Sequence, residues 1–194
     1  VGLERVFLFG DARPFAQCHA STLVETRDGG ILVAFFGGTH EGHPDVAIWT
    51  CAGHTACGVT HFDPPMLAAK IGDVAHWNPV LYRVDGGSAD ADDVVALQFK
   101  VGPRIRSWQT WLACSHDGGR RGGPARPLVA DDRDGRGGRG AVRNKPIRLA
   151  SGDWLAGASI EAWRRWEAFF DRSPNGLGGW QATARVAVDR GTFR

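Results

Sequence analysis

Residues 18–49 read CHASTLVETRDGGILVAFFGGTHEGHPDVAIW, and this stretch decides how the rest of the chain is interpreted. A short β-prone run over 21–26 is followed by Asp-Gly-Gly at 28–30, which supplies the positive φ angles of a tight hairpin turn. Residues 31–36 are almost wholly apolar, which is typical of a strand buried on both faces. A loop of polar and titratable residues over 39–45 leads into another β-prone run. The stretch therefore predicts three antiparallel strands, with a chemically rich loop between the second and the third.

The composition is that of an ordinary globular protein with one core. The chain has 194 residues, of which 43% are hydrophobic and 23% are charged. Its formal net charge is only +2, so neither nucleic acid nor an anionic membrane is expected as a partner. The sequence has no run of about 18 apolar residues, so no membrane-spanning helix is expected. The first residues lack the pattern of a signal peptide, and both ends of the sequence look cut, which leaves the compartment open.

The four cysteines contain no Cys-x-x-Cys pair, so a structural zinc site is not expected. The loop His40-Glu41-Gly42-His43 resembles a zinc-protease helix only superficially. Its histidines are three residues apart rather than four, and Gly42 with Pro44 disfavours a helix. We therefore expect neither a metal nor another cofactor.

One pattern occurs three times along the chain: a polar patch opens a strand, a glycine-containing turn follows, and an apolar strand comes next. The polar patches are Cys18-His19-Ala20-Ser21-Thr22, His76-Trp77-Asn78-Pro79-Val80 and Arg143-Asn144-Lys145-Pro146-Ile147. Their starts lie about 58 and about 67 residues apart, close to the period of a propeller blade. We expect three blades, at about 15–70, 74–130 and 141–190.

The Arg- and Gly-rich stretch 131–142 is expected to be a flexible surface loop between the second and third blades. An RGG-like nucleic-acid segment is the alternative, but no aromatic residues interleave its arginines as base-stacking platforms require.

Two further segments end a strand with Ser, then Asp or Asn, then Gly: Ser115-His116-Asp117-Gly118-Gly119 and, more loosely, Ser173-Pro174-Asn175-Gly176. The first is the S-x-D-x-G turn of Asp-box propellers. Together with HASTLVE, FGGTHEGHPDVAIW, HWNPVL, FKVGP and NKPI, it resembles the bacterial predicted neuraminidases, sialidase-like proteins with BNR repeats. The resemblance spans roughly residues 15–180. It implies an all-β fold, a six-bladed propeller of four-stranded antiparallel blades with the site on the central axis.

About three blades are present, and four are the practical minimum for closing a ring. We therefore expect a partial propeller with an open apolar blade face. The remainder of the propeller, or a second copy of the chain, would be needed to cover that face.

In a propeller, the polar patches that open the innermost strands converge on the axis. The residues expected to bind substrate there are His19, Ser21, His76, Asn78, Lys100, Arg143, Asn144 and Lys145. The candidates for catalysis are Asp45, Glu41, His43 and Glu161. Cations suit the carboxylate of an acidic glycan, and carboxylates suit proton transfer. Each of these residues has a structural alternative, such as bonding the backbone at a blade entrance or capping a turn.

The resemblance implies specific roles and also shows gaps. Asp45 lies where sialidase-like enzymes carry an acid/base aspartate, with Glu41 or His43 assisting. Glu161 is a candidate for the carboxylate that activates a nucleophile. His19 and Ser21 stand where a sialidase has its first substrate-binding arginine, and the single tyrosine, Tyr82, matches no catalytic context. Two hypotheses follow. One is an exo-sialidase-like glycoside hydrolase acting on an acidic glycan, by hydrolysis or elimination. The other is a non-catalytic propeller that binds a glycan or a protein.

Overall fold

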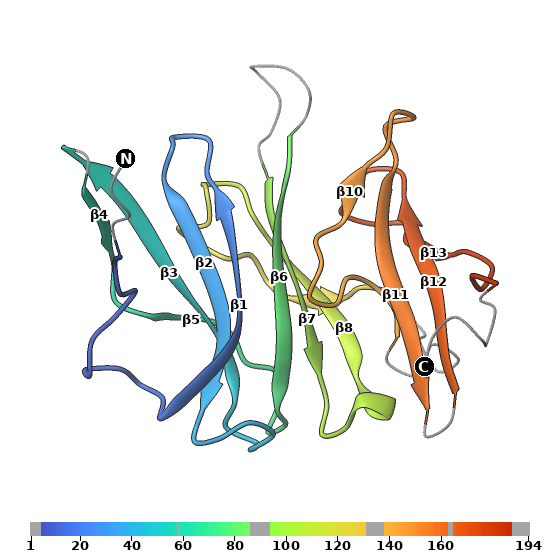
Figure 1. Cartoon of the computed structure of the whole chain (residues 1–194), viewed down its shortest axis with the longest axis horizontal. Helices are drawn as coiled ribbons and strands as arrows, with labels where there is room; N and C mark the ends of the chain where they lie inside the picture. The colour runs from blue at the N-terminus through green and yellow to red at the C-terminus, as the bar shows by residue number, and fades with distance from the viewer. Residues whose placement is uncertain (1–4, 58, 86–93, 131–137, 163–164, 188–194) are drawn as a thin grey trace.

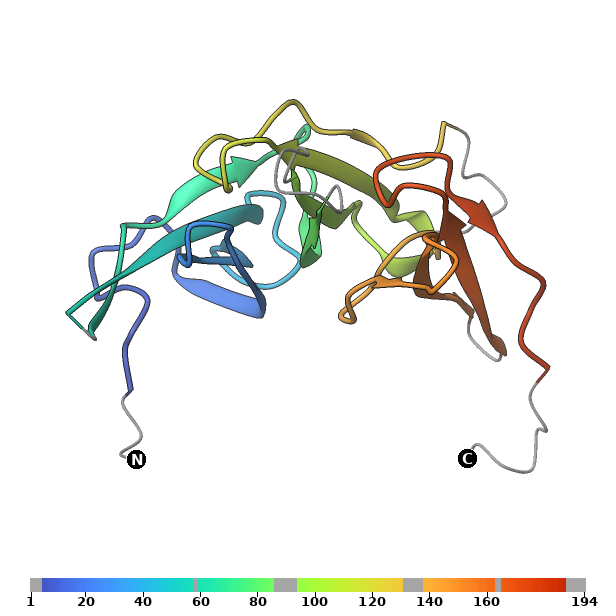
Figure 2. The same ribbon diagram turned by 90° about the horizontal axis from the view of Figure 1, so that it is seen from above.

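Three antiparallel sheets stand side by side and fan into an arc (Figures 1 and 2). The computed structural model describes residues 5–57, 59–85, 94–130, 138–162 and 165–187. Within these ranges the structure is β throughout, apart from one 3₁₀ turn at Ile105–Ser107. Among the described residues, no helix has the length and apolar character needed to cross a bilayer. The all-β partial propeller predicted from the sequence is confirmed.

Each sheet is built from consecutive strands. The first contains β1 (Gln17–Glu25), β2 (Ile31–Gly38), β3 (Ala47–Ala56) and β4 (Val59–Phe62), and β5 (Met66–Ala69) pairs with β3 as a fifth strand. The second contains β6 (His76–Val84), β7 (Val94–Val101), β8 (Gln109–Ser115) and β9 (Arg126–Pro127). The third contains β10 (Ile147–Arg148), β11 (Trp154–Ala162), β12 (Arg165–Ser173) and β13 (Gln181–Ala182). The strands that open the sheets, β1, β6 and β10, lie toward the concave side of the arc (Figure 2).

The Asp-box turn after β8 is held by its own side chains, as the sequence predicts. The Ser115 hydroxyl donates to Asp117 Oδ1 over 2.6 Å and accepts from Gly119 N over 2.8 Å, while Asp117 Oδ1 accepts from Arg121 N over 2.9 Å. The looser turn after β12 uses Ser173 and Asn175 in the same way. Such local bonds fix the hairpin between two outer strands without help from other blades.

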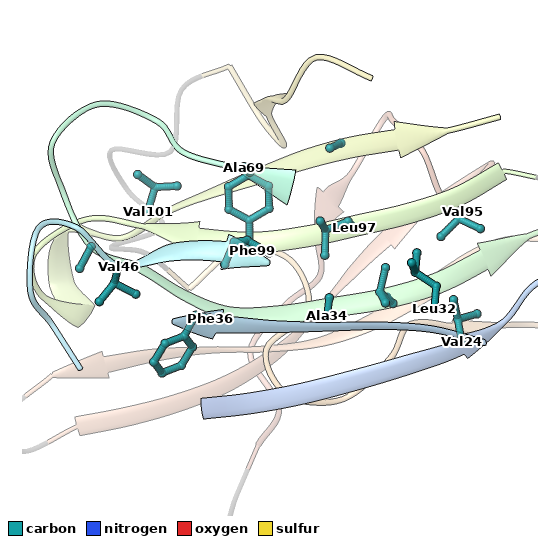
Figure 3. Close-up of a cluster of buried hydrophobic side chains, with 14 residues drawn as sticks. Val24, Leu32, Ala34, Phe36, Val46, Ala69, Val95, Leu97, Phe99 and Val101 are labelled. Carbon is teal, nitrogen blue, oxygen red and sulfur yellow. The ribbon is translucent and has the colours of Figure 1, made fainter. Parts of the chain in front are cut away.

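An apolar cluster joins the first two sheets (Figure 3). Leu32, Ala34 and Phe36 of β2 pack in it with Leu97 and Phe99 of β7. Alternate residues of β2 point into this cluster, which is why a strand buried on both faces reads as a continuous apolar run. Burying a side chain the size of Phe99 contributes about 1.5–3 kcal/mol, so this junction is held mainly by the hydrophobic effect.

The junction between the second and third sheets combines apolar packing with buried polar bonds. Tyr82 packs against Trp154 with ring centroids 5.7 Å apart, and its hydroxyl donates to Gly176 O over 2.8 Å. Gln98 is fully buried. Its amide donates to the Tyr82 hydroxyl and accepts from Ala141 N, each over 2.8–2.9 Å. This network ties β6 and β7 to the segment that leads into the third sheet.

Beside that network lies a second buried polar group, which we call the ionic lock and which consists of Lys100, Thr110, Arg139 and Asp171. The Arg139 guanidinium bonds Asp171, whose side chain is 0% exposed, with an Nε to Oδ1 distance of 2.8 Å. Gly140 N donates to the same carboxylate over 2.5 Å. The described end of the 131–142 stretch is therefore not the flexible surface loop expected from its composition, because this bonding buries it; residues 131–137 lie outside the described residues.

The two outer faces of the arc differ. Over the first sheet, the chain's own N-terminal segment packs Phe9 and Phe15 onto Phe35, with ring centroids 5.4 Å from it. On the third sheet, Trp166 and Phe170 of β12 are 76% and 40% exposed. One end of the arc is thus covered from within the chain, and the other presents aromatic side chains to solvent.

Candidate functional site

A pocket of about 310 Å³ lies where β1 and β6 begin, and all three repeat units contribute to it. Its lining comprises His19, Ala20, Ser21, Phe36, Glu41, Asn78, Pro79 and Arg143. The structure therefore brings together five of the residues singled out from the sequence, from segments up to about 120 residues apart. Their roles in binding or catalysis stay predictions.

Left-handed backbone shapes this pocket, at a β-bulge in two of the three positions. Ala20, Asn78 and Arg143 have φ angles of 54°, 43° and 64°, which few residues other than glycine adopt. In β1, Ala20 and Ser21 together oppose one residue of β2, and in β6 the pair Asn78 and Pro79 likewise opposes one residue of β7. A bulge turns side chains away from the regular alternation of the strand. Each left-handed position costs about 1–2 kcal/mol, and such strain gathers at functional sites.

The lining of the pocket combines aromatic and charged side chains. The His19 imidazole stacks on Phe36 at 5.6 Å with an 18° angle between the planes. Phe36 is almost fully buried and forms the apolar wall. Glu41 and Arg143 supply one charge of each sign. Within the described part of the chain, the side chains of these two residues make no ion pair or hydrogen bond with the protein. They are therefore available to a bound molecule.

Asp45 is engaged elsewhere and does not line the pocket. Its carboxylate accepts from Thr39 N over 3.0 Å and from the Thr39 hydroxyl over 2.5 Å, and His43 Nδ1 lies 2.8 Å from Oδ1. The bond from the Thr39 hydroxyl, followed by the other bonds of the loop, lowers the Asp45 pKa to about 2. A general acid must carry a proton near neutral pH. This environment does not favour the acid role expected for Asp45. His43 contacts Asp45 within the same loop and does not line the pocket.

His76 is not on the pocket surface, contrary to expectation, because it is fully buried. Its Nε2 accepts from Ile71 N over 2.8 Å, which assigns the proton to Nδ1, 3.0 Å from Val74 O. Burial, and then the charge of Lys70, lowers the His76 pKa to about 4. His76 is therefore a neutral structural histidine that joins two backbone segments, and its predicted substrate contact is wrong.

Lys100 is likewise fully buried rather than at a solvated strand end. Its ammonium donates to the Thr110 hydroxyl over 2.7 Å and to the Arg139 carbonyl, within the ionic lock. The predicted contact of Lys100 with substrate is wrong for the same physical reason.

The remaining candidates lie near the pocket or away from it, but not in its lining. Lys145 is exposed as a residue, but its ammonium donates to Leu23 O of β1, and the partial burial of that group lowers the Lys145 pKa. Asn144 is exposed next to Arg143. Glu161 lies toward the end of β11, accepts from the Ser159 hydroxyl over 3.1 Å and pairs across the sheet with Trp166. No described contact gives these three a role in the pocket, so their assignments stay predictions.

Sequence reasoning missed three lining residues, Ala20, Phe36 and Pro79. Ala20 carries no signal, because an alanine in left-handed backbone looks like any other alanine. Pro79 did carry one, since a proline inside a sheet strand is confined to edges and bulges. Within the described residues, no group of three or more His, Cys, Asp or Glu side chains is arranged to hold a metal ion.

Comparison with protein families matches residues 29–191 to the BNR repeat-like domain. The chain belongs to this family. Among proteins of curated function, no significant match to the sequence was found. The BNR-repeat assignment agrees with the Asp-box turn, the repeated hairpins and the arc of sheets described above.

Solved structures similar to this BNR-repeat chain include glycoside hydrolases. An α-L-arabinanase of Penicillium chrysogenum complexed with arabinobiose has 15% identity and a TM-score of 0.62 over 98% of this chain and 56% of its own. An α-L-arabinofuranosidase of Fusarium graminearum with an iminosugar inhibitor has 12% identity and a TM-score of 0.58, over 90% and 51%. A protein of unknown function from Dyadobacter fermentans has 15% identity and a TM-score of 0.61, over 89% and 56%.

These similarities support the propeller fold of the BNR-repeat chain. Sequence identities this low establish a shared fold but not a shared function. The chain spans about half the length of the structures it matches. The BNR-repeat chain is thus a partial propeller with glycoside-hydrolase neighbours, and the sialidase-like activity expected from the sequence goes beyond what they establish.

Proposed function

We propose that the pocket binds the terminal sugar of an acidic glycan and that the protein is a glycoside hydrolase of sialidase-like design. The observation that carries the proposal is that His19, Asn78 and Arg143, one from each repeat unit, line one pocket together with a carboxylate, Glu41. Support also comes from the two molecules named for the similar structures, the sugar arabinobiose and an iminosugar inhibitor.

Arg143 is the residue we assign to the acidic group. A guanidinium presents a planar fork of donors that matches a carboxylate, and hydrogen bonds between charged groups are the strong ones. The aromatic wall of Phe36 and the His19 ring suit the apolar face of a sugar. Because His19 and Ser21 replace an arginine expected in a sialidase, a uronic acid is the substrate class we favour over sialic acid.

Glu41 is the residue we assign to proton transfer. In hydrolysis, a carboxylic acid protonates the leaving glycosidic oxygen while the bond from that oxygen to the anomeric carbon breaks, and water completes the exchange. Glycosidases use two carboxylates for this chemistry. Glu41 is the one carboxylate in the described lining, so the proposal places the second on the opposite side of a complete ring.

The test compares release of aglycone from 4-methylumbelliferyl sialoside, β-glucuronide and α-L-arabinofuranoside by the protein with its ring complete, since the proposal places the second carboxylate there. We expect the glucuronide to be cleaved, and Arg143→Ala to lower kcat/KM on it about 10–100-fold through KM, since a hydrogen bond to a charged group contributes about 1.5–3 kcal/mol. Arg106→Ala, on the exposed 3₁₀ turn, is the matched control and should leave the rate unchanged. Preference for the arabinofuranoside with no effect of Arg143→Ala would remove the acidic group from the proposal.

A non-catalytic glycan-binding propeller is the second candidate, because the described pocket has a single carboxylate and Asp45 is held ionised. Saturable binding of glucuronate by calorimetry, with no release from any of the three substrates, would favour it.

We also propose that further propeller blades cover the outward face of the third sheet. Support comes from the exposure of Trp166 and Phe170 beside Ala168, and from the roughly twofold greater length of the similar structures. For the 20.9 kDa chain we expect a hydrophobic dye to bind, and Trp166→Glu to lower its fluorescence several-fold. Ile105→Glu, at another exposed apolar residue, is the control. Absence of dye binding with a dimeric mass in light scattering would assign the cover to a second copy instead.

A further inference from the structure

One lysine outside the pocket holds two of the segments that form it. Lys70 directly follows β5, and its ammonium donates to three backbone carbonyls: to Pro44 O, to Val46 O over 3.3 Å and to Val74 O over 2.9 Å. An ammonium has three donors, so all of them are directed to main-chain oxygens. The first two carbonyls belong to the end of the β2–β3 loop, and the third belongs to the segment that leads into β6.

His76 adds further bonds between the β2–β3 loop and the segment that leads into β6. Its imidazole bonds Ile71 N and Val74 O, and its backbone N donates to Val46 O over 3.2 Å. The ring stacks on Phe99 at 5.8 Å with an angle of 20°. Because this histidine is neutral, it sits beside the Lys70 ammonium without repulsion. Lys70 and His76 thus form a polar clasp between the first two sheets, and the name clasp is used below for this pair.

The clasp lies between two pocket residues along the chain. Glu41 precedes Pro44 by three residues, and Asn78 follows His76 by two. The tip of the loop also rests on the second sheet, since a Cβ at Gly42 would lie 3.3 Å from the Trp77 ring. Trp77 in turn is fixed by its indole N–H, which donates to Gly102 O over 2.7 Å. The root of the loop is held by Lys70 and its tip by Trp77.

We infer that Lys70 is a positioning residue, which sets where the Glu41 carboxylate stands relative to Asn78 across the junction of the first two blades. The expected effect of Lys70 on catalysis rests on the proposed function. The structural content of the inference, that one ammonium fixes the β2–β3 loop against the segment before β6, stands on the contacts alone.

The test uses Lys70→Met in the full chain, since methionine keeps an unbranched apolar stem and removes all three donors. We expect hydrogen–deuterium exchange to rise about tenfold or more in peptides covering 39–46 and 70–76, with no change in β11 and β12. On a substrate that the wild-type protein cleaves, kcat should fall at least tenfold while KM changes less than threefold, because Arg143 and His19 are untouched. Lys70→Arg retains donors and should restore most of both readouts.

Arg120→Met is the matched control, because it removes an exposed ion pair to Asp28 at 2.8 Å, away from the pocket. It should alter neither the exchange of the two loops nor turnover. Unchanged exchange in both loops of Lys70→Met would overturn the inference whatever the activity. Loosened loops with unchanged kcat would reduce Lys70 to a scaffold residue and also overturn it. If the wild-type protein cleaves no substrate, the proposed function fails, and the exchange of the two loops decides on the clasp alone.

Discussion

Asp171→Asn should destabilise the protein by about 3–5 kcal/mol, the largest stability effect expected of any single polar substitution in the described residues. The Asp171 side chain is 0% exposed and that of Arg139 is 15% exposed, so the substitution leaves a buried guanidinium without its counter-charge. It also turns an amide donor toward either Arg139 or Gly140 N, which donates to this carboxylate over 2.5 Å. Breaking a buried ion pair from one side carries a cost of this size. Urea unfolding followed by tryptophan fluorescence measures it.

The same sheet supplies a matched control for that experiment. Asp153 also pairs with an arginine, Arg172, but the arginine side chain is 57% exposed. Water screens such a pair, so Asp153→Asn should cost less than about 1 kcal/mol. A double-mutant cycle with Arg139→Met should show strong coupling to Asp171. Equal effects of the two aspartate variants would mean that the ionic lock does not hold the third sheet.

If the proposed function holds, Glu41→Gln should lower kcat on the glycoside that the protein cleaves by about 10²–10⁴-fold, the loss typical when a general acid or base is removed. Glutamine keeps the size of the side chain and its capacity to accept a hydrogen bond, but it carries no transferable proton. Substrate affinity should change little, because Arg143 and the Phe36 wall remain in place. Single-turnover kinetics at saturating substrate separate the chemical step from binding.

Glu25→Gln, at the far end of β1 and exposed, is the control for the loss of one surface carboxylate. It should leave kcat within twofold of the wild-type value. If Glu41→Gln cleaves at the wild-type rate, Glu41 has no part in proton transfer. An effect of Asp45→Asn on the same substrate, with Glu41→Gln silent, would return the acid/base role to Asp45 despite the bonds that hold it ionised.

The strands and turns were within reach of sequence reasoning because their causes are local. The apolar run of β2, the Asp-Gly-Gly turn before it and the Ser-Asp pairing at 115–117 each depend on neighbours a few residues away. Repetition of that pattern also led to the expectation that polar patches from three units meet. His19, Asn78 and Arg143 do share one pocket, although they are far apart in the sequence.

The burial of His76 and Lys100 was not predictable, because their partners come from other segments. Lys100 is accommodated in the core by the Arg139 carbonyl, 39 residues further along a stretch whose composition suggests a surface loop. His76 depends on backbone groups whose position is set by the turn after β5. The environment of Asp45 was not predictable either. Its position resembles that of a catalytic aspartate, but the resemblance does not reveal that the Thr39 hydroxyl bonds the carboxylate and lowers its pKa. Residue type predicts capacity for chemistry, and long-range contacts decide whether it is used.

The construction of each sheet from contiguous chain has a consequence for synthesis. Strands β1 to β5 finish by Ala69, so the first sheet can pair completely while the second is still being translated, and the second can then form against it. The pocket behaves differently, because Arg143 reaches it only after most of the chain has emerged. During translation the first two sheets can therefore form before the pocket is complete, because the pocket waits for Arg143 from the segment that leads into the third sheet.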